Sequence, residues 1–279
     1  MKPDPFHNPS EELLISRLPN SHQPTHNLVL NKYPVISNHF ILSTVAFKKQ
    51  TDILEGEDLA ITYACLQAWA AEPVEHSPGQ LFAFFNSGGA SGASQAHRHL
   101  QFLPVEDMKD SVISPVQWRP LIDLLLESGA YHGDFKVLAG LPLKHFALPF
   151  PSTPSPNDLV RIYHTLYKLA ADSIGNSKAR ETVETYHPGS DTLPATFSYN
   201  LAMTTKGMAI CPRSSESAKI PAQGGTGHAA VNGTLLAGTF MLKEESEWTA
   251  LRSCEVDIDE LLVQLGHPVP KDEKILANR

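Results

Sequence analysis

Hydrophobic and polar residues alternate along several short runs of the chain, a pattern that indicates β-strands. Three other segments, 57–71, 157–174 and 257–265, have apolar residues at helical spacing, and Asn157 or Asp158 would cap the second of them. Because most strands are joined by turns, we predict an α+β fold with an antiparallel sheet. The expected strands are 27–35, 40–47, 81–85, 97–105, 131–149, 196–203, 208–212 and 233–242.

Two stretches lack this periodicity and divide the chain into units. Residues 1–26 are rich in Pro, Asn, His and Ser, so we expect a loosely ordered lead-in with at most one helical turn near 13–18. Residues 175–194 are polar and aperiodic, typical of a linker or surface loop. We therefore predict a lead-in (1–26), an N-terminal half (27–174) and a C-terminal half (195–279).

Composition limits the possible partners. The formal net charge of −8 would repel nucleic acid and anionic membranes, so an anionic ligand would need a locally basic pocket. The sequence contains no apolar run long enough for a membrane span, and its first residues do not read as a signal peptide. Three widely spaced cysteines argue against a disulfide framework. We expect a cytoplasmic protein, with the nucleus also possible, and a small-molecule partner.

The run 97–105 carries the candidate chemistry. In a strand, His97, His99 and Gln101 line one face, while Arg98 and Leu100 lie on the other. A single histidine on such a face is more often structural than catalytic. Two histidines followed by an amide, next to a glycine- and serine-rich loop, favour a functional site.

The loop 86–95 precedes this strand. Gly88, Gly89 and Gly92 allow its backbone N–H groups to approach an anion, and its serines add neutral donors. The loop lacks the Gly-Lys-Ser/Thr sequence of a nucleotide-binding P-loop. Beside the paired histidines, we interpret it as a cradle for phosphate groups.

These residues resemble the signature of the histidine triad superfamily. Asn86, Gly92-Ala93-Ser94 and His97-Arg98-His99-Leu100-Gln101 match it, with glutamine in place of the third histidine, as in the transferase branches. The longer string is similar to the fungal diadenosine tetraphosphate phosphorylases. Further matches extend over most of the chain: Asn31-Lys32-Tyr33, Asn38-His39-Phe40, Lys144-His145-Phe146, Ser198-Tyr199-Asn200, Pro212-Arg213-Ser214, Asn232 and Lys243.

The resemblance implies a histidine-triad-like fold, shared with galactose-1-phosphate uridylyltransferases, with two related halves. It also implies that His99 attacks the α-phosphorus of diadenosine tetraphosphate, expels ATP and becomes adenylyl-histidine, from which phosphate takes the adenylyl group as ADP. The His97 carbonyl would hold one ring nitrogen of His99 as N–H. Gln101 can hydrogen-bond a phosphoryl oxygen but exchanges no proton, which favours a transferase over a hydrolase.

The same resemblance assigns the binding residues. Lys32 and Lys243 would neutralise substrate charge, with Lys48 and Lys49 as weaker candidates. Thr239 stands where the family has methionine, which puts the nucleoside end of the pocket in question. The expected ligands are dinucleoside polyphosphates, ATP, ADP, AMP and phosphate, with no tightly bound cofactor, no protein-held metal and a divalent cation such as Mg²⁺ on the substrate phosphates. The full binding set is Lys32, Asn86, Gly92, Ala93, Ser94, Gln95, Asn232, Gly233, Thr234, Thr239 and Lys243.

Three alternatives stay open. Uridylyltransferases share His-x-His-x-Gln but commonly hold a zinc through a Cys-x-x-Cys pair, which this sequence lacks. His97 and His99 have the spacing of metal ligands, although no cluster of cysteines or acids supplies the remaining ligands. A non-catalytic nucleotide-binding protein on the same fold is the third alternative.

Overall fold

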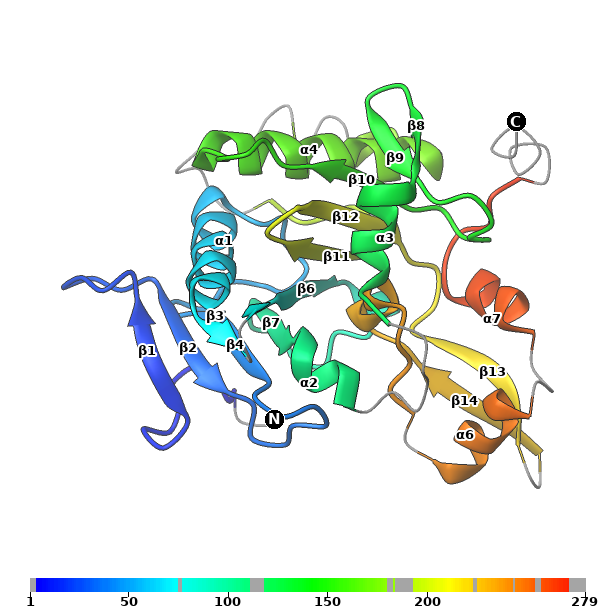
Figure 1. Ribbon diagram of the computed structural model, residues 1–279, viewed down its shortest axis with the longest axis horizontal. Coiled ribbons are helices and arrows are strands. Elements are labelled where there is room, and N and C mark those ends of the chain that lie inside the picture. Colours follow the sequence, from blue (N-terminus) through cyan, green and yellow to red (C-terminus); the bar gives the residue numbers. More distant parts are fainter. Residues whose placement is uncertain are drawn as a thin grey trace.

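One large antiparallel sheet organises the molecule (Figure 1). The computed structural model describes residues 4–74, 77–110, 118–179, 183, 193–222, 225–242, 244–253 and 257–270. Within these residues, ten strands pair in the order β1-β2-β3-β7-β6-β11-β12-β10-β9-β8. They are β1 (Leu14–Leu18), β2 (His26–Leu30), β3 (Phe40–Thr44), β6 (Leu81–Ser87), β7 (His99–Pro104), β8 (Ala130–His132), β9 (Phe135–Val137), β10 (Phe146–Pro149), β11 (Tyr199–Thr204) and β12 (Gly207–Pro212).

Helices and small hairpins cover the sheet on both faces. Helices α1 (Gly56–Ala71) and α4 (Pro156–Ser173) pack on one face around Leu100 and Phe102 of β7. The other face buries Phe84 and Leu103. Helices α2 (Val105–Asp110) and α3 (Leu121–Ser128) and the 3₁₀ helix η2 (Gly233–Ala237) contact the strands of this face. Helices α6 (Glu245–Arg252) and α7 (Ile258–Leu265) pack instead on the hairpin β13 (Ser217–Ala222)–β14 (Gly225–Ala230). The remaining elements are the short β4 (Pro73–Val74)–β5 (Ser77–Pro78) pair and the 3₁₀ turn η1 (Gly89–Ser91).

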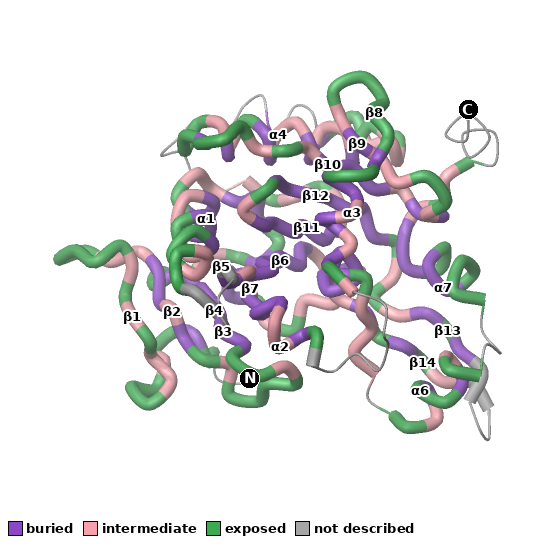
Figure 2. Tube along the Cα trace, in the orientation of Figure 1, coloured by how far each residue is buried: buried purple, intermediate pink, exposed green. Residues whose placement is uncertain are grey.

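The two expected halves meet in the middle of the sheet. Strand β11 of the C-terminal half pairs directly with β6 of the N-terminal half, and Asn200 lies opposite Asn86. The central strands are buried along their length, whereas β1 at the sheet edge alternates half-buried and exposed residues (Figure 2). Both halves therefore contribute to the hydrophobic core on each face of the sheet. The exact boundaries that we assigned to the units stay predictions.

The predicted antiparallel α+β fold is confirmed, with local differences. Residues 14–18 form strand β1 where we expected at most a helical turn. The expected strand 233–242 begins instead as 3₁₀ helix η2, and the expected loop 222–227 contains the ends of β13 and β14. Helix α4 begins earlier than predicted, because Ser155 is its N-cap and Pro156 its first residue. Among the described helices, none combines the length and the apolar character that a membrane span requires.

Candidate active site

His99 opens strand β7 in the middle of the sheet and is almost completely buried, with 3% of its surface exposed. Its Nδ1 lies 2.8 Å from the carbonyl oxygen of His97. A carbonyl only accepts, so Nδ1 carries the ring proton and Nε2 keeps its lone pair. The predicted tautomer contact to His97 is thus present in the structure.

The environment of His99 also keeps its ring neutral. Burial lowers the pKa of His99 to about 4, and this effect outweighs the bond to the His97 carbonyl, which raises it. His97 and His39 nearby lower it further through their charge. At neutral pH the Nε2 lone pair is therefore available as a nucleophile.

The main chain of His99 is held by Gln50, a residue with only 2% exposure. The Gln50 Oε1 accepts the His99 N–H at 2.7 Å, and Nε2 donates to the His99 carbonyl at 3.1 Å. The same Nε2 donates to the carbonyl of Asn86 at 2.8 Å. One side-chain amide thereby ties the nucleophile to the start of the loop 86–95.

The N-terminal segment packs against both histidines. The Phe6 ring lies 5.0 Å from the His99 ring and 5.9 Å from the His97 ring, measured between centroids, and is 5% exposed. Asp4 Oδ2 lies 2.8 Å from His97 Nδ1, and Thr44 Oγ1 lies 3.0 Å from His97 Nε2. Residues that we had assigned to a loose lead-in are therefore part of the site.

The glycine-rich loop is fixed against the C-terminal half. Gly88 and Gly92 have positive φ, and a side chain at Gly92 would press on Asn232. The Asn86 Oδ1 accepts from Asn200 Nδ2 at 2.9 Å and from the Gly233 N–H at 2.8 Å. The structure thus brings four predicted binding residues together beside β7, in contacts between segments far apart in the sequence.

The other predicted binding residues are placed differently. Thr234 and Thr239 each donate their hydroxyl to the other's carbonyl, so both hydroxyls serve the turn around η2. Lys32 is exposed and lies over the ring of Tyr33. In the loop, Ser94 is exposed, whereas Ala93 and Gln95 are half-buried. Lys243 lies outside the described residues.

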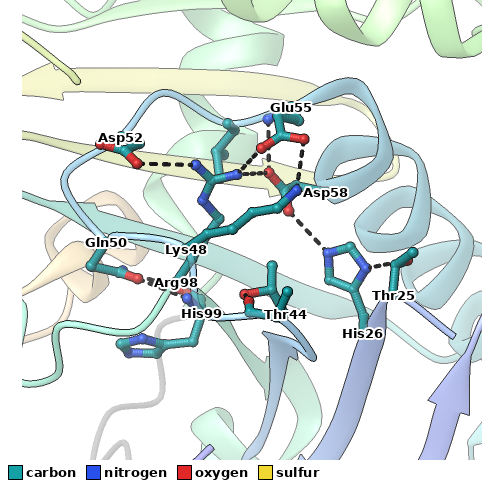
Figure 3. Close-up of polar contacts among 12 residues, drawn as sticks. Thr25, His26, Thr44, Lys48, Gln50, Asp52, Glu55, Asp58, Arg98 and His99 are labelled. Carbon is teal, nitrogen blue, oxygen red and sulfur yellow. Dashed lines mark hydrogen bonds and ion pairs between the residues drawn. The ribbon is translucent and has the colours of Figure 1, made fainter. Parts of the chain in front are cut away.

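The opposite face of β7 holds a charged cluster around Arg98, whose side chain is fully buried (Figure 3). Its NH1 contacts Glu55 at 2.7 Å and Asp58 at 2.9 Å, both at the start of α1. Lys48, one of the weaker substrate candidates, pairs with Glu55 at 2.7 Å in the same cluster. Arg98 therefore anchors α1 beneath the strand that carries His99.

Three of the four ring nitrogens of His97 and His99 are engaged in other contacts. Both nitrogens of His97 and the Nδ1 of His99 already have partners in Asp4, Thr44 and the His97 carbonyl. Across the described ranges, no group of three or more His, Cys, Asp or Glu side chains is arranged to hold a metal ion. A chelating pair would have to give up these bonds.

Sequence reasoning missed Gln50, Asp4 and Phe6. No spacing rule identifies Gln50, because its role depends on the crossing of two chain segments 49 residues apart. The burial of Phe6 depends likewise on contacts with a strand more than 90 residues away. The isolated aromatic residue in an otherwise polar segment was the available signal.

Comparison with known proteins finds relatives that match almost the whole chain. A family model described as the Ap4A phosphorylase N-terminal domain matches residues 1–122, and one described as the ATP adenylyltransferase C-terminal domain matches residues 139–268. Diadenosine 5',5'''-P1,P4-tetraphosphate phosphorylase 2 of Saccharomyces cerevisiae is 27% identical, covering 97% of this chain and 78% of the yeast protein. Protein APA1 of the same yeast is 26% identical with the same coverage.

Solved structures give the same result. The crystal structure of yeast Ap4A phosphorylase Apa2 in complex with Ap4A superposes with a TM-score of 0.74 at 25% identity, covering 96% of this chain and 81% of that chain. The Apa2 complex with AMP gives a TM-score of 0.72 at 26% identity, covering 96% and 82%. The likeness therefore covers the sheet and both halves.

Proposed function

The chain belongs to the diadenosine tetraphosphate phosphorylase family, and from that premise we propose that it cleaves diadenosine tetraphosphate with inorganic phosphate to give ATP and ADP. The observation that carries the proposal is the His99 ring, with Nδ1–H held by the His97 carbonyl and Nε2 left as a neutral nucleophile. This state is the one required to attack phosphorus.

The reaction proceeds in two displacements. The Nε2 of His99 bonds to the α-phosphorus of the dinucleotide, the bond from this phosphorus to the bridging oxygen breaks, and ATP leaves with that oxygen. A phosphate oxygen then bonds to the adenylyl phosphorus, the phosphorus–nitrogen bond breaks, and ADP leaves. Throughout, Nδ1–H stays bonded to the His97 carbonyl, which stabilises the positive charge that develops on the ring.

The side chains around His99 have complementary roles in this proposal. Gln101, on the same face of β7, donates its amide N–H to the reacting phosphoryl group. The backbone of the loop 86–92, held open by Gly88 and Gly92, receives the remaining phosphate oxygens. Lys32 and Lys243 neutralise the outer phosphates, and Asn232 shapes the pocket wall against Gly92.

Products from the purified protein test the proposal. The protein is incubated with diadenosine tetraphosphate, with and without phosphate, and nucleotides are identified by mass. ATP and ADP that form only with phosphate, and that disappear in a His99→Ala variant, are expected. Turnover of UDP-glucose with galactose 1-phosphate would instead indicate a uridylyltransferase. Tight nucleotide binding with neither set of products would indicate a binding protein.

We also propose the conditions in which the protein works. It holds no tightly bound cofactor, and Mg²⁺ or a similar cation arrives bound to the substrate phosphates. A chelator should therefore lower the activity, and the amount of Mg²⁺ that restores it should rise in proportion to the substrate concentration. Its ligands are nucleotides and phosphate, with no membrane or nucleic-acid partner. The location is the cytoplasm, with the nucleus also accessible, and imaging of a fluorescent fusion would test this.

A further inference from the structure

A further histidine, His39, lies on the catalytic face of the sheet one strand away from Gln101. It immediately precedes β3, which pairs with β7 so that Ile41 lies opposite Gln101. His39 is two residues before Ile41 and shares its face, which places it diagonally across from Gln101. The side chain is 7% exposed.

The bonds around His39 fix which of its nitrogens carries the proton. The Oδ1 of Asn31 accepts the N–H of Tyr33 at 3.1 Å, so the amide nitrogen of Asn31 must be the atom that faces His39. That nitrogen donates to His39 Nδ1 at 2.9 Å. The Asn31 main chain is also tied to the His39 carbonyl at 2.9 Å. A neutral His39 ring therefore has its proton on Nε2.

The protonated nitrogen is the one that lacks a partner. His39 Nε2 is buried and has no hydrogen-bond partner in the described part of the chain. Burial lowers the pKa of His39 to about 4, and the side chain of Gln101 opposes this effect by raising it. The Gln101 side chain is therefore a neighbour that influences the His39 ring.

We propose that His39 is a positioning residue for Gln101: its Nε2–H binds the Gln101 Oε1 and so turns the amide NH₂ toward the phosphoryl group that is transferred to His99. The proposal rests on the phosphorylase function proposed above. An amide can present either end to a phosphoryl oxygen, and only the NH₂ end attracts it. The relay from Tyr33 N–H through Asn31 and His39 selects that end before substrate binds.

This role explains an otherwise costly feature. A buried donor without an acceptor is destabilising. Buried His145 differs, because both of its ring nitrogens are bonded to the main chain, at Leu143 and Leu138. In the proposal, the Nε2 of His39 finds its acceptor in Gln101, which lies diagonally across from His39 in the sheet.

Two measurements test the proposal. Ring-nitrogen NMR of the substrate-free protein should find His39 as the Nε2–H tautomer and His99 as the Nδ1–H tautomer; a His39 ring protonated on Nδ1 would overturn the proposal. In the turnover assay, His39→Phe should lower kcat roughly 10- to 100-fold, as removal of a supporting partner of a catalytic group does, with little change in KM. His145→Phe is the matched control and should keep its kcat.

A double-variant cycle separates positioning from a general structural effect. If His39 acts through Gln101, the variant carrying both His39→Phe and Gln101→Ala should be no slower than Gln101→Ala alone. Multiplied losses, or an unchanged kcat in a folded His39→Phe protein, would overturn the proposal. If His39→Phe does not fold, Asn31→Ala serves as the test instead. This variant removes the hydrogen bond that keeps the His39 proton on Nε2, so it should also lower kcat. If the wild-type protein shows no phosphorolysis, the proposed function is refuted. The NMR measurement of the His39 tautomer does not depend on that activity and still tests the proposal for His39.

Discussion

Replacing Gln50 with methionine would remove the clamp on the His99 main chain while nearly preserving side-chain volume. Three hydrogen bonds are lost, two to His99 and one to the Asn86 carbonyl. The His99 N–H then has no acceptor in a buried position. At about 1–3 kcal/mol for each buried group left unsatisfied, the variant should lose roughly 2–5 kcal/mol of unfolding free energy.

Activity should fall further than stability alone explains. Without the clamp, His99 and the loop that begins at Asn86 can shift relative to each other. A displacement of about 1 Å between reacting groups can cost roughly 100-fold in rate. We therefore expect kcat for ATP formation from diadenosine tetraphosphate and phosphate to fall by about that factor, at a temperature where the variant is fully folded.

Gln80→Met is the matched control. Its Nε2 donates to Asp123 at 2.6 Å, so this variant also loses a glutamine bond, in a partly buried position. Gln80 precedes β6 at the end of the β6–β7 pair opposite to His99, roughly 15–20 Å away at about 3.3 Å per residue. Both variants should unfold at a lower temperature than the wild-type protein, whereas only Gln50→Met should have a lower kcat. Equal kcat in the two proteins would refute a positioning role for Gln50.

Three other outcomes follow from the same contacts. Phe6→Ala should lower kcat about 10-fold because the His99 ring loses its packing partner, and a steady-state assay that finds wild-type kcat would contradict this. The pKa values of His99, His39 and His145 are about 4 in the folded protein and near 6.5 in the unfolded chain, so between these pH values the unfolded chain binds more protons. The unfolding free energy measured in urea should therefore fall as the pH drops from 6.5 toward 4. An increase over this range would contradict the prediction. Arg98→Met should cost about 3–5 kcal/mol, since it removes the guanidinium from buried Asp58 and half-buried Glu55, and equal urea midpoints would count against the cluster's role.

The reacting face of β7 could be predicted from the sequence because strand geometry is local. Alternation alone places His99 and Gln101 on one face and Arg98 on the other, and a residue two positions earlier offers its carbonyl to the His99 ring. Asn86 and the glycine loop follow for a similar reason, since they directly precede the strand that carries the nucleophile.

Contacts between distant segments could not be predicted in this way. The run Leu235-Leu236-Ala237 is equally compatible with a strand and a short helix, and the Asn232 cap and the left-handed Gly238 decide for the helix. Strand β1 shows only a half-buried pattern, because it lies at the sheet edge. The role of Gln50 is visible only once its segment has been placed across β7.

The pairing of β6 with β11 determines what happens when the chain is divided into two separately expressed pieces. Residues 1–122 and 139–268 match separate family models, yet these two strands share five paired positions in the middle of the sheet. Either piece expressed alone would expose a long, apolar strand edge, which is a template for aggregation. When both pieces are produced in one cell, their complementary strand edges can pair and restore the sheet. The protein could therefore be divided into a split reporter whose signal is the formation of ATP.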